Sequence, residues 1–198
     1  MDFFESYEIV VAGGGVAGVA AALEAARSGF KTALVEKTVF FGGLATTGLI
    51  NVYLPLCDGS GRQVIFGIAE ELLHLSIRYG PGTVPAGWKG GAQGKKTSRF
   101  LVEFSPAAFV LALDEVLQAA GVHLWLDTLA CTPVVEGGRV TGVEVENKGG
   151  RGMLQACCVI DATGDADLAY RAGVPCVLQD NWMSFWAHQV SREKLSKA

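Results

Sequence analysis

The sequence YEIVVAGGGVAG, residues 7–18, decides the fold. Its first six residues are mostly β-branched or apolar, which is typical of a buried strand. Glycines then occupy the first, third and sixth positions of the following turn, at Gly13, Gly15 and Gly18. Gly13 allows a tight turn, Gly15 has no side chain to keep a phosphate from the backbone, and Gly18 lets a helix pack close to the strand. The pattern predicts a turn that binds a pyrophosphate.

A helix and a second strand complete this unit. The stretch from Val16 to about Ser28 is rich in Ala and Leu and predicts a helix. The free N–H groups of its first turn, which includes Ala17, would face the phosphates. A second apolar strand at residues 31–35 ends at Glu36, where a carboxylate can accept hydrogen bonds from both hydroxyls of a ribose. A 2′-phosphate would be repelled there, so we expect a dinucleotide other than NADP.

Length and composition limit the possible functions. At 198 residues the chain is long enough for one domain, or for one domain and part of another. Half of the residues are apolar and 18% are charged, which suffices for a substantial core and argues against disorder. The net charge of −4 gives no reason to expect a nucleic-acid partner. No apolar run reaches the length of a membrane span, so we expect no membrane partner.

Two features indicate a cytoplasmic location. The N-terminus is acidic and lacks the basic region that begins a signal peptide. The cysteines form neither a CxxC pair nor an even framework, so the preferred interpretation is free core thiols in a reducing cytoplasm. They are Cys57, Cys131, Cys157, Cys158 and Cys176. The sequence contains no metal-ligand spacing.

The middle of the chain predicts a loop and two helices. Gly42, Gly43, Thr46 and Thr47 suggest a loop that passes close to something flat or charged, and a plain turn is the alternative. Apolar spacing predicts an amphipathic helix over residues 64–79. Ser105 and Pro106, as N-cap and first helical residue, predict the next helix. Between them, residues 80–99 are rich in glycine and include four cations, which suits either a lid for an anionic substrate or a solvated surface loop: Lys89, Lys95, Lys96 and Arg99.

The last third of the chain predicts a β-meander and a second ligand-contacting turn. Short strands are expected at residues 122–126, 130–135, 139–145 and 152–160, with glycine pairs in the two turns that join the last three. The final strand leads into Ala162, Thr163, Gly164 and Asp165, where small residues would let the backbone touch a ligand. Asp165 suits either sugar-like hydroxyls or the N-cap of a short helix.

Four segments together resemble the FAD-dependent oxidoreductases of the glutathione-reductase-like superfamily. They are the glycine turn with Glu36, the double-glycine segment at residues 42–47, the hairpin region around Ala130, and the segment 159–165, which resembles that superfamily's ATGD segment. The double-glycine motif often has arginines where this chain has Phe40 and Leu44, which affects charge contacts and leaves the backbone role intact. The resemblance spans residues 7–175.

The resemblance implies an α/β fold, namely a Rossmann-like FAD-binding domain with a central parallel sheet and a β-meander. The FAD-binding domain would cover residues 1–175, and residues 176–198 would begin a truncated substrate domain. The first glycine turn would cradle the pyrophosphate, and Glu36 followed by Lys37 would hold the adenosine. The backbone near Ala130 would hold the adenine, while Gly42, Gly43, Thr46 and Thr47 would lie near the pyrophosphate, ribityl chain or flavin edge. The segment 162–165 would contact the flavin nucleotide, with Asp165 at its pyrophosphate–ribityl end.

The implied activity is hydride transfer between a small organic substrate and the flavin N5, here in the N-terminal part of a longer enzyme. An NAD-binding dehydrogenase, or a flavin-binding remnant or partner subunit without turnover, are the alternatives. No catalytic acid or base is predicted. Cys57 suits a redox thiol less well than a core or loop cysteine. The substrate and the oligomeric state are not predicted.

Overall fold

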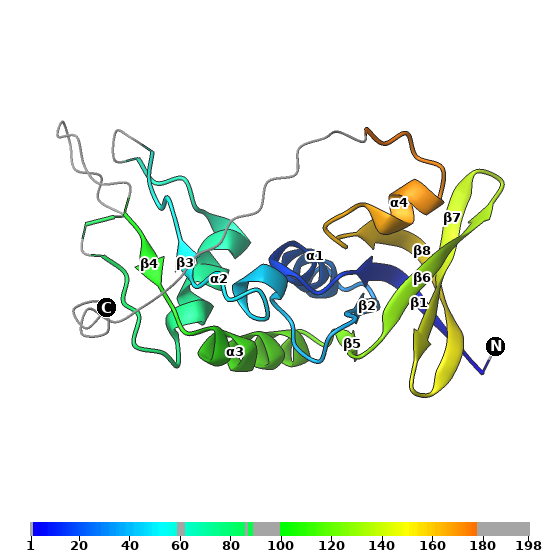
Figure 1. Ribbon diagram of the computed structural model, residues 1–198, viewed down its shortest axis with the longest axis horizontal. Coiled ribbons are helices and arrows are strands. Elements are labelled where there is room, and N and C mark those ends of the chain that lie inside the picture. Colours follow the sequence, from blue (N-terminus) through cyan, green and yellow to red (C-terminus); the bar gives the residue numbers. More distant parts are fainter. Residues whose placement is uncertain (1, 59–61, 86, 89–99, 178–198) are drawn as a thin grey trace, which may run out of the picture.

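The computed structural model describes residues 2–58, 62–85, 87–88 and 100–177. Its centre is a six-stranded sheet in the order β5-β2-β1-β8-β7-β6 (Figure 1). The strands are β1 (Phe3–Ala12), β2 (Thr32–Val35), β5 (His123–Trp125), β6 (Leu129–Glu136), β7 (Arg139–Asn147) and β8 (Gly150–Asp161). The predicted central parallel sheet with a β-meander is therefore confirmed.

The parallel half of the sheet brings the ligand-contacting turns together. Strands β5, β2, β1 and β8 run parallel, with β1 between β2 and β8. At the carboxyl end of β1, Ala12 lies beside Val35 on one side and Asp161 on the other. Because the carboxyl ends of parallel strands meet at one edge, the turns after all three strands lie together.

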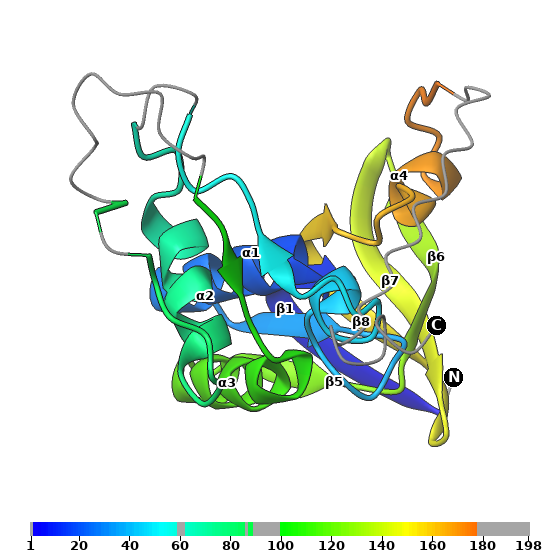
Figure 2. The ribbon, with the colours of Figure 1, turned by 60° about the vertical axis from the view of Figure 1, so that its left-hand side comes forward.

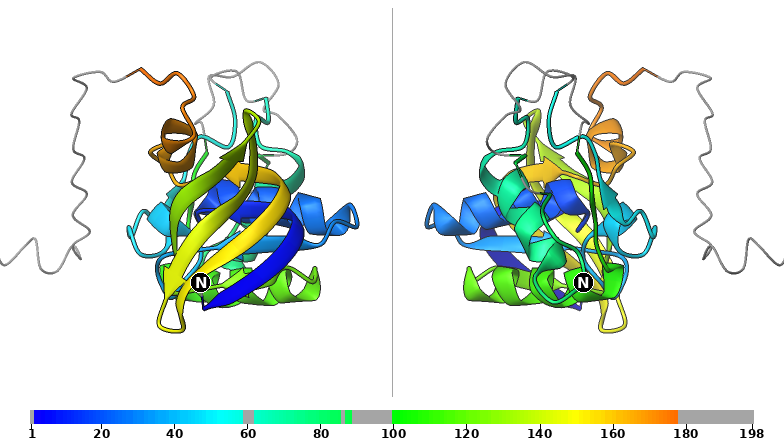
Figure 3. Two further views of the ribbon diagram at one scale, coloured as in Figure 1. Left: turned by 90° about the vertical axis from the view of Figure 1, so that its right-hand side faces the viewer. Right: turned by 90° about the vertical axis from the view of Figure 1, so that its left-hand side faces the viewer.

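Strand β8 belongs to both halves of the sheet. From Gly150 to Gln155 it pairs antiparallel with β7, which in turn pairs with β6, and these three strands curl away together (Figure 3). From Ala156 onward, β8 pairs with β1 alone among the described strands. Cys157 and Cys158 lie in that part and are exposed, as is Cys176. The prediction of core thiols is wrong for these three. For Cys157 and Cys158 the reason is that β7 leaves β8 before this segment.

Alternate residues of the parallel strands supply two cores. Val11 and Leu34 face the helices α1 (Val16–Arg27), α2 (Gly67–Ile77) and α3 (Pro106–Ala119). Val10 and Ala33 point the other way and pack with β7 and β8. Figure 2 shows α2 and α3 on one side and the meander with the short helix α4 (Asp167–Arg171) on the other. The parallel strands thus form the layer between helices and meander.

The sequence pattern explains where the helices begin and what they bury. In α1, Ala22 and Ala25 are buried, as small residues must be where a helix presses on a sheet. The Ser105 hydroxyl accepts a hydrogen bond from the Ala108 N–H at 3.3 Å, and Pro106 is the first residue of α3, as predicted. A bidentate pair between Arg27 and Glu71, at 2.6 and 2.7 Å, joins α1 to α2.

A smaller unit extends the fold on the helix side. Strands β3 (Val52–Tyr53) and β4 (Val102–Glu103) pair antiparallel. They pack with α2 over a third cluster that includes the buried Cys57 and Trp88. The four cations of the lid or surface loop predicted at residues 80–99 lie outside the described residues. Most of the segment 176–198 lies outside them as well. The proposed domain boundary therefore stays a prediction.

Among the described helices, none has the length and apolar character needed to cross a membrane.

Candidate functional site

The three glycines of the first turn have different surroundings. Gly13 has a φ of 100°, a conformation that suits glycine. A Cβ on Gly18 would lie 1.8 Å from the Gly13 carbonyl oxygen, so close packing requires a glycine there. A Cβ on Gly15 would meet nothing within 4 Å, although its φ of −65° suits any residue. Protein packing therefore does not explain Gly15, and the space that a side chain would fill there is open.

Glu36 links the second strand to this turn. Its carboxylate accepts hydrogen bonds from the Gly14 N–H at 2.7 Å and from the Thr38 N–H at 2.8 Å. The side chain is buried at 7% exposure. Each carboxylate oxygen keeps further acceptor capacity. The geometry thus holds the carboxylate rigidly at the strand end, where it can also accept from ribose hydroxyls.

The double-glycine segment packs directly on the first turn. The Gly42 N–H donates to the Gly14 carbonyl at 2.8 Å, and a Cβ on Gly43 would lie 3.1 Å from the Gly15 Cα. The hydroxyl of the buried Thr46 donates to the Phe41 carbonyl at 2.7 Å, whereas the exposed Thr47 donates to Gly43 at 3.1 Å. Two glycine-rich backbones therefore lie face to face, and Thr46 fastens the second of them.

The segment after β8 is organised by an aspartate that the sequence analysis did not single out. Asp161 accepts hydrogen bonds from the Thr163 N–H, the Thr163 hydroxyl and the Ala169 N–H at 3.1, 2.7 and 2.8 Å. Burial alone raises the pKa of Asp161, but these hydrogen bonds outweigh burial and hold the pKa below its ordinary value. Its place at a strand end, before small residues, was the signal that could have found it.

Asp165 is not the N-cap of the short helix. The N-cap of α4 is Ala166, at φ 57°, and the Asp167 N–H donates to the Thr163 hydroxyl at 3.0 Å. Asp165 is exposed. The N-cap alternative is wrong because the left-handed residue at 166 moves the start of the helix one position on. The contact with a ribityl chain stays a prediction.

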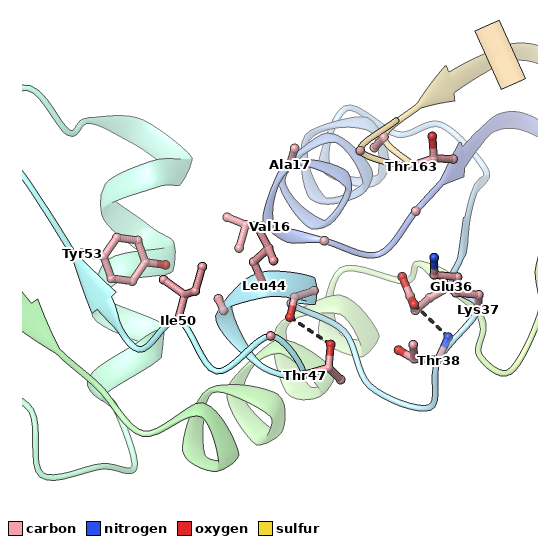
Figure 4. Close-up of a pocket in the computed structure, with 18 of the residues that line it drawn as sticks. Val16, Ala17, Glu36, Lys37, Thr38, Leu44, Thr47, Ile50, Tyr53 and Thr163 are labelled. Atoms are coloured by element: carbon pink, nitrogen blue, oxygen red, sulfur yellow. Dashed lines mark hydrogen bonds between the residues drawn. The ribbon is translucent and has the colours of Figure 1, made fainter. Parts of the chain in front are cut away.

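Most predicted residues line one cavity of about 710 Å³ (Figure 4). Its lining includes Gly13, Gly15, Val16, Ala17, Glu36, Lys37, Gly42, Gly43, Thr47, Ala162, Thr163 and Gly164. The exceptions are Gly18 and Thr46, which are buried beneath it, the exposed Asp165, and Ala130. Ala130 lines a smaller adjoining cavity of about 80 Å³ together with Glu36, Lys37 and Asp167.

The cavity has a polar end and an apolar end. Glu36, Lys37 and Thr38 lie at one end, and Ile50 and Tyr53 lie at the other (Figure 4). The apolar lining is completed by residues that sequence reasoning missed, namely Leu44, Val52 and Phe104. Phe104 directly follows β4 and is distant in sequence from Leu44 and Val52. The spacing of residues in the sequence therefore gave no signal that it lines the cavity. Among the described residues, no cluster of His, Cys, Asp and Glu suits a metal ion.

These features define a class of protein. The start of α1 has no side-chain cap, so its N–H groups are available to phosphate oxygens. The open space at Gly15, the carboxylate of Glu36 and a cavity within the usual size range for cofactors fit a dinucleotide. The molecule is thus a dinucleotide-binding protein of the Rossmann type.

The family follows from a comparison with known proteins. Residues 8–189 match the model of the family described as FAD dependent oxidoreductase. The chain therefore belongs to the FAD dependent oxidoreductase family, whose cofactor is FAD. A stretch of 73 residues is 36% identical to a thioredoxin reductase of Ureaplasma parvum serovar 3, and covers 37% of this chain and 24% of that protein.

Solved structures share the fold. A geranylgeranyl bacteriochlorophyll reductase-like protein from Thermoplasma acidophilum is similar with a TM-score of 0.58 at 23% identity, over 86% of this chain and 43% of that one. A myxobacterial FAD-dependent chondrochloren halogenase is similar with a TM-score of 0.57 at 21% identity, over 80% and 37% of the two chains. The chain thus spans less than half the length of each of these proteins.

Proposed function

We propose that the chain binds FAD in the large cavity and forms the cofactor-binding part of an enzyme that oxidises or reduces a small organic substrate. The observation that carries the proposal is the open space at Gly15, which faces the cavity between two glycine-rich backbones. A pyrophosphate fits there because backbone N–H groups and the positive end of α1 meet at this point.

The polarity of the cavity orients the cofactor. Glu36 at the polar end is suited to the adenosine ribose, and the small cavity beside Ala130 is suited to the adenine. The ring end then lies toward Ile50, Val52 and Phe104. Apolar side chains there exclude water from the ring and bury its area.

Bound FAD supplies the hydride chemistry at its ring, and the chain supplies position and electrostatics. Glu36 and the glycine turns hold the adenosine half, while the apolar end keeps the ring in place for a substrate. The small organic substrate and a cytoplasmic location, suggested by the absence of disulfides among the described cysteines, are parts of this proposal.

A titration with FAD tests the proposed function. Wild-type protein should quench flavin fluorescence stoichiometrically and gain about 2.7 kcal/mol of stability when free FAD reaches 100 times its Kd. NAD should produce no comparable stabilisation. Stabilisation by NAD and none by FAD would favour the alternative of an NAD-binding dehydrogenase and overturn the proposal. Bound FAD without turnover of candidate substrates, both in the chain alone and after addition of candidate partner chains, would instead favour a flavin-binding remnant.

The FAD affinities of two glutamate variants test whether Glu36 binds the adenosine ribose. Glu36→Ala removes a charge-assisted hydrogen bond worth about 1.5–3 kcal/mol and should weaken FAD binding about 10- to 150-fold. Glu8→Ala is the matched control, since Glu8 also accepts a backbone N–H, from Lys31 at 2.8 Å, but does not line the cavity. Equal affinities in the two variants would contradict the assignment, with denaturation curves checking that both are folded.

A further inference from the structure

Tyr53 is held in place by packing on both sides. It belongs to β3 and pairs with Val102 of β4. Its ring lies 5.2 Å from the ring of Phe104, between centroids, and contacts both the main helix-side core and the cluster around Cys57. A tyrosine fixed in this way cannot easily turn its hydroxyl elsewhere.

The Tyr53 hydroxyl is buried and has no hydrogen-bond partner among the described residues. It points toward the side of Ile50 and the interior of the cavity (Figure 4). Burial raises the pKa of Tyr53 to about 12, so the group stays protonated and remains a donor at any physiological pH. A buried hydroxyl without a partner destabilises the folded protein, and such a group in a cavity wall needs an explanation.

The surroundings of this hydroxyl are otherwise apolar. The described residues that line the cavity together with Tyr53 include the apolar side chains of Val16, Leu44, Ile50, Val52 and Phe104. None of those five side chains can donate a hydrogen bond. Tyr53 is therefore a side-chain donor with which this end could recognise a polar atom on a mostly apolar, planar ligand.

We propose that the Tyr53 hydroxyl donates a hydrogen bond to the polar edge of the bound flavin ring, an inference that rests on the FAD site proposed above. With the adenosine at Glu36 and the pyrophosphate at Gly15, the ring reaches the end of the cavity where Tyr53 lies. Ile50 is 49% exposed and follows Leu49, which has a φ of 58°. Because Ile50 is half exposed, entry of the ring would displace its side chain toward solvent and uncover the hydroxyl.

Tyr53→Phe in the full-length protein tests the inference, with Tyr7→Phe as the matched control. Tyr7 is also buried, but its hydroxyl accepts a hydrogen bond from the Trp125 indole N–H at 3.0 Å, on the opposite face of the sheet. Without FAD, Tyr53→Phe should match or exceed the wild-type melting temperature, whereas Tyr7→Phe should melt lower. With FAD, Tyr53→Phe should raise the Kd about 2- to 13-fold, the range for one neutral hydrogen bond, and shift the visible flavin band.

The outcomes separate the inference from the proposed function. Wild-type Kd and flavin spectrum in Tyr53→Phe would overturn the role of Tyr53 and leave the FAD site intact. A melting temperature lowered as far as in Tyr7→Phe would also overturn it, since the hydroxyl would then have a partner within the protein. Failure of the wild type to bind FAD would overturn the proposed function itself.

Discussion

At the scale of single residues, similar glycines have different reasons to be glycine. Gly18 is required by packing, because a Cβ there would overlap the Gly13 carbonyl. Gly15 is free of protein contacts in the direction of a Cβ and has an ordinary backbone conformation. Substitution by alanine should therefore affect ligand binding at Gly15 and the stability of the fold at Gly18.

Gly15→Ala should keep the fold and lose the ligand, whereas Gly18→Ala should lose stability. An alanine at Gly15 costs no more than about 1 kcal/mol as a poorer N-cap, but its methyl group would occupy the place that we propose for a phosphate. We expect a loss in FAD affinity of at least about tenfold, or 1.4 kcal/mol. Urea denaturation and FAD titration of both variants measure the two effects. Unchanged FAD affinity in Gly15→Ala would exclude this turn as the phosphate site.

At the scale of elements, Asp161 joins the end of β8 to the start of α4. One carboxylate oxygen holds Thr163 and the other holds Ala169, so the turn carrying Ala162 and Gly164 keeps its shape against the cavity. The carboxylate form makes these bonds, which is why the pKa of Asp161 is lowered in the folded protein despite burial. The stability that it contributes should therefore depend on pH.

Asp161→Asn should destabilise the protein at neutral pH and cease to do so in acid. Because the folded-state pKa lies below the ordinary value of 3.8, the stabilisation is present above that value and is lost as pH falls through the folded pKa. Denaturation of wild type and variant between pH 7 and about pH 2.5 checks this. Asp165→Asn is the control, since Asp165 is exposed. A difference between wild type and Asp161→Asn that persists unchanged into acid would contradict the prediction.

At the scale of the whole molecule, the two halves of strand β8 have different surroundings. The first half of β8 is covered by β7, and Val143, Val145 and Leu154 are fully buried there. The second half pairs with β1 alone among the described strands, and the cysteines at 157 and 158 are exposed. Cys57, in contrast, is buried and donates to the Trp88 carbonyl at 3.3 Å.

Thiol alkylation should therefore distinguish the cysteines of the native chain. Cys157, Cys158 and Cys176 should react rapidly with iodoacetamide, and Cys131, which is half-buried, should react more slowly. Cys57 should react only on unfolding, since burial excludes the reagent and raises the pKa of the thiol. Mass spectrometry of timed samples measures each rate. Protection of Cys157 and Cys158 to the level of Cys57 would show that another element covers this part of β8.

Local patterns predicted much of the architecture because their causes are local. The glycine turn, the N-cap at Ser105 and the tight hairpin at Gly137–Gly138 each depend on a few neighbouring residues, and each is present. Strand ends differed by a few residues, as in β1, which begins at Phe3 and not at Tyr7. Pairing with β8 extends β1, and a partner distant in sequence leaves no local signal.

The sequence alone determined the strand-turn-helix-strand unit, the tight turn at Gly13, the close packing at Gly18 and the place of Glu36 at the end of the second strand, because backbone freedom and alternating burial act over a few residues. Only the tertiary structure decided that Gly42 bonds to Gly14, that Tyr53 and Phe104 close the apolar end, and that Cys157 and Cys158 are exposed. The reason is that these features depend on which distant segments pack together, and on where β7 parts from β8.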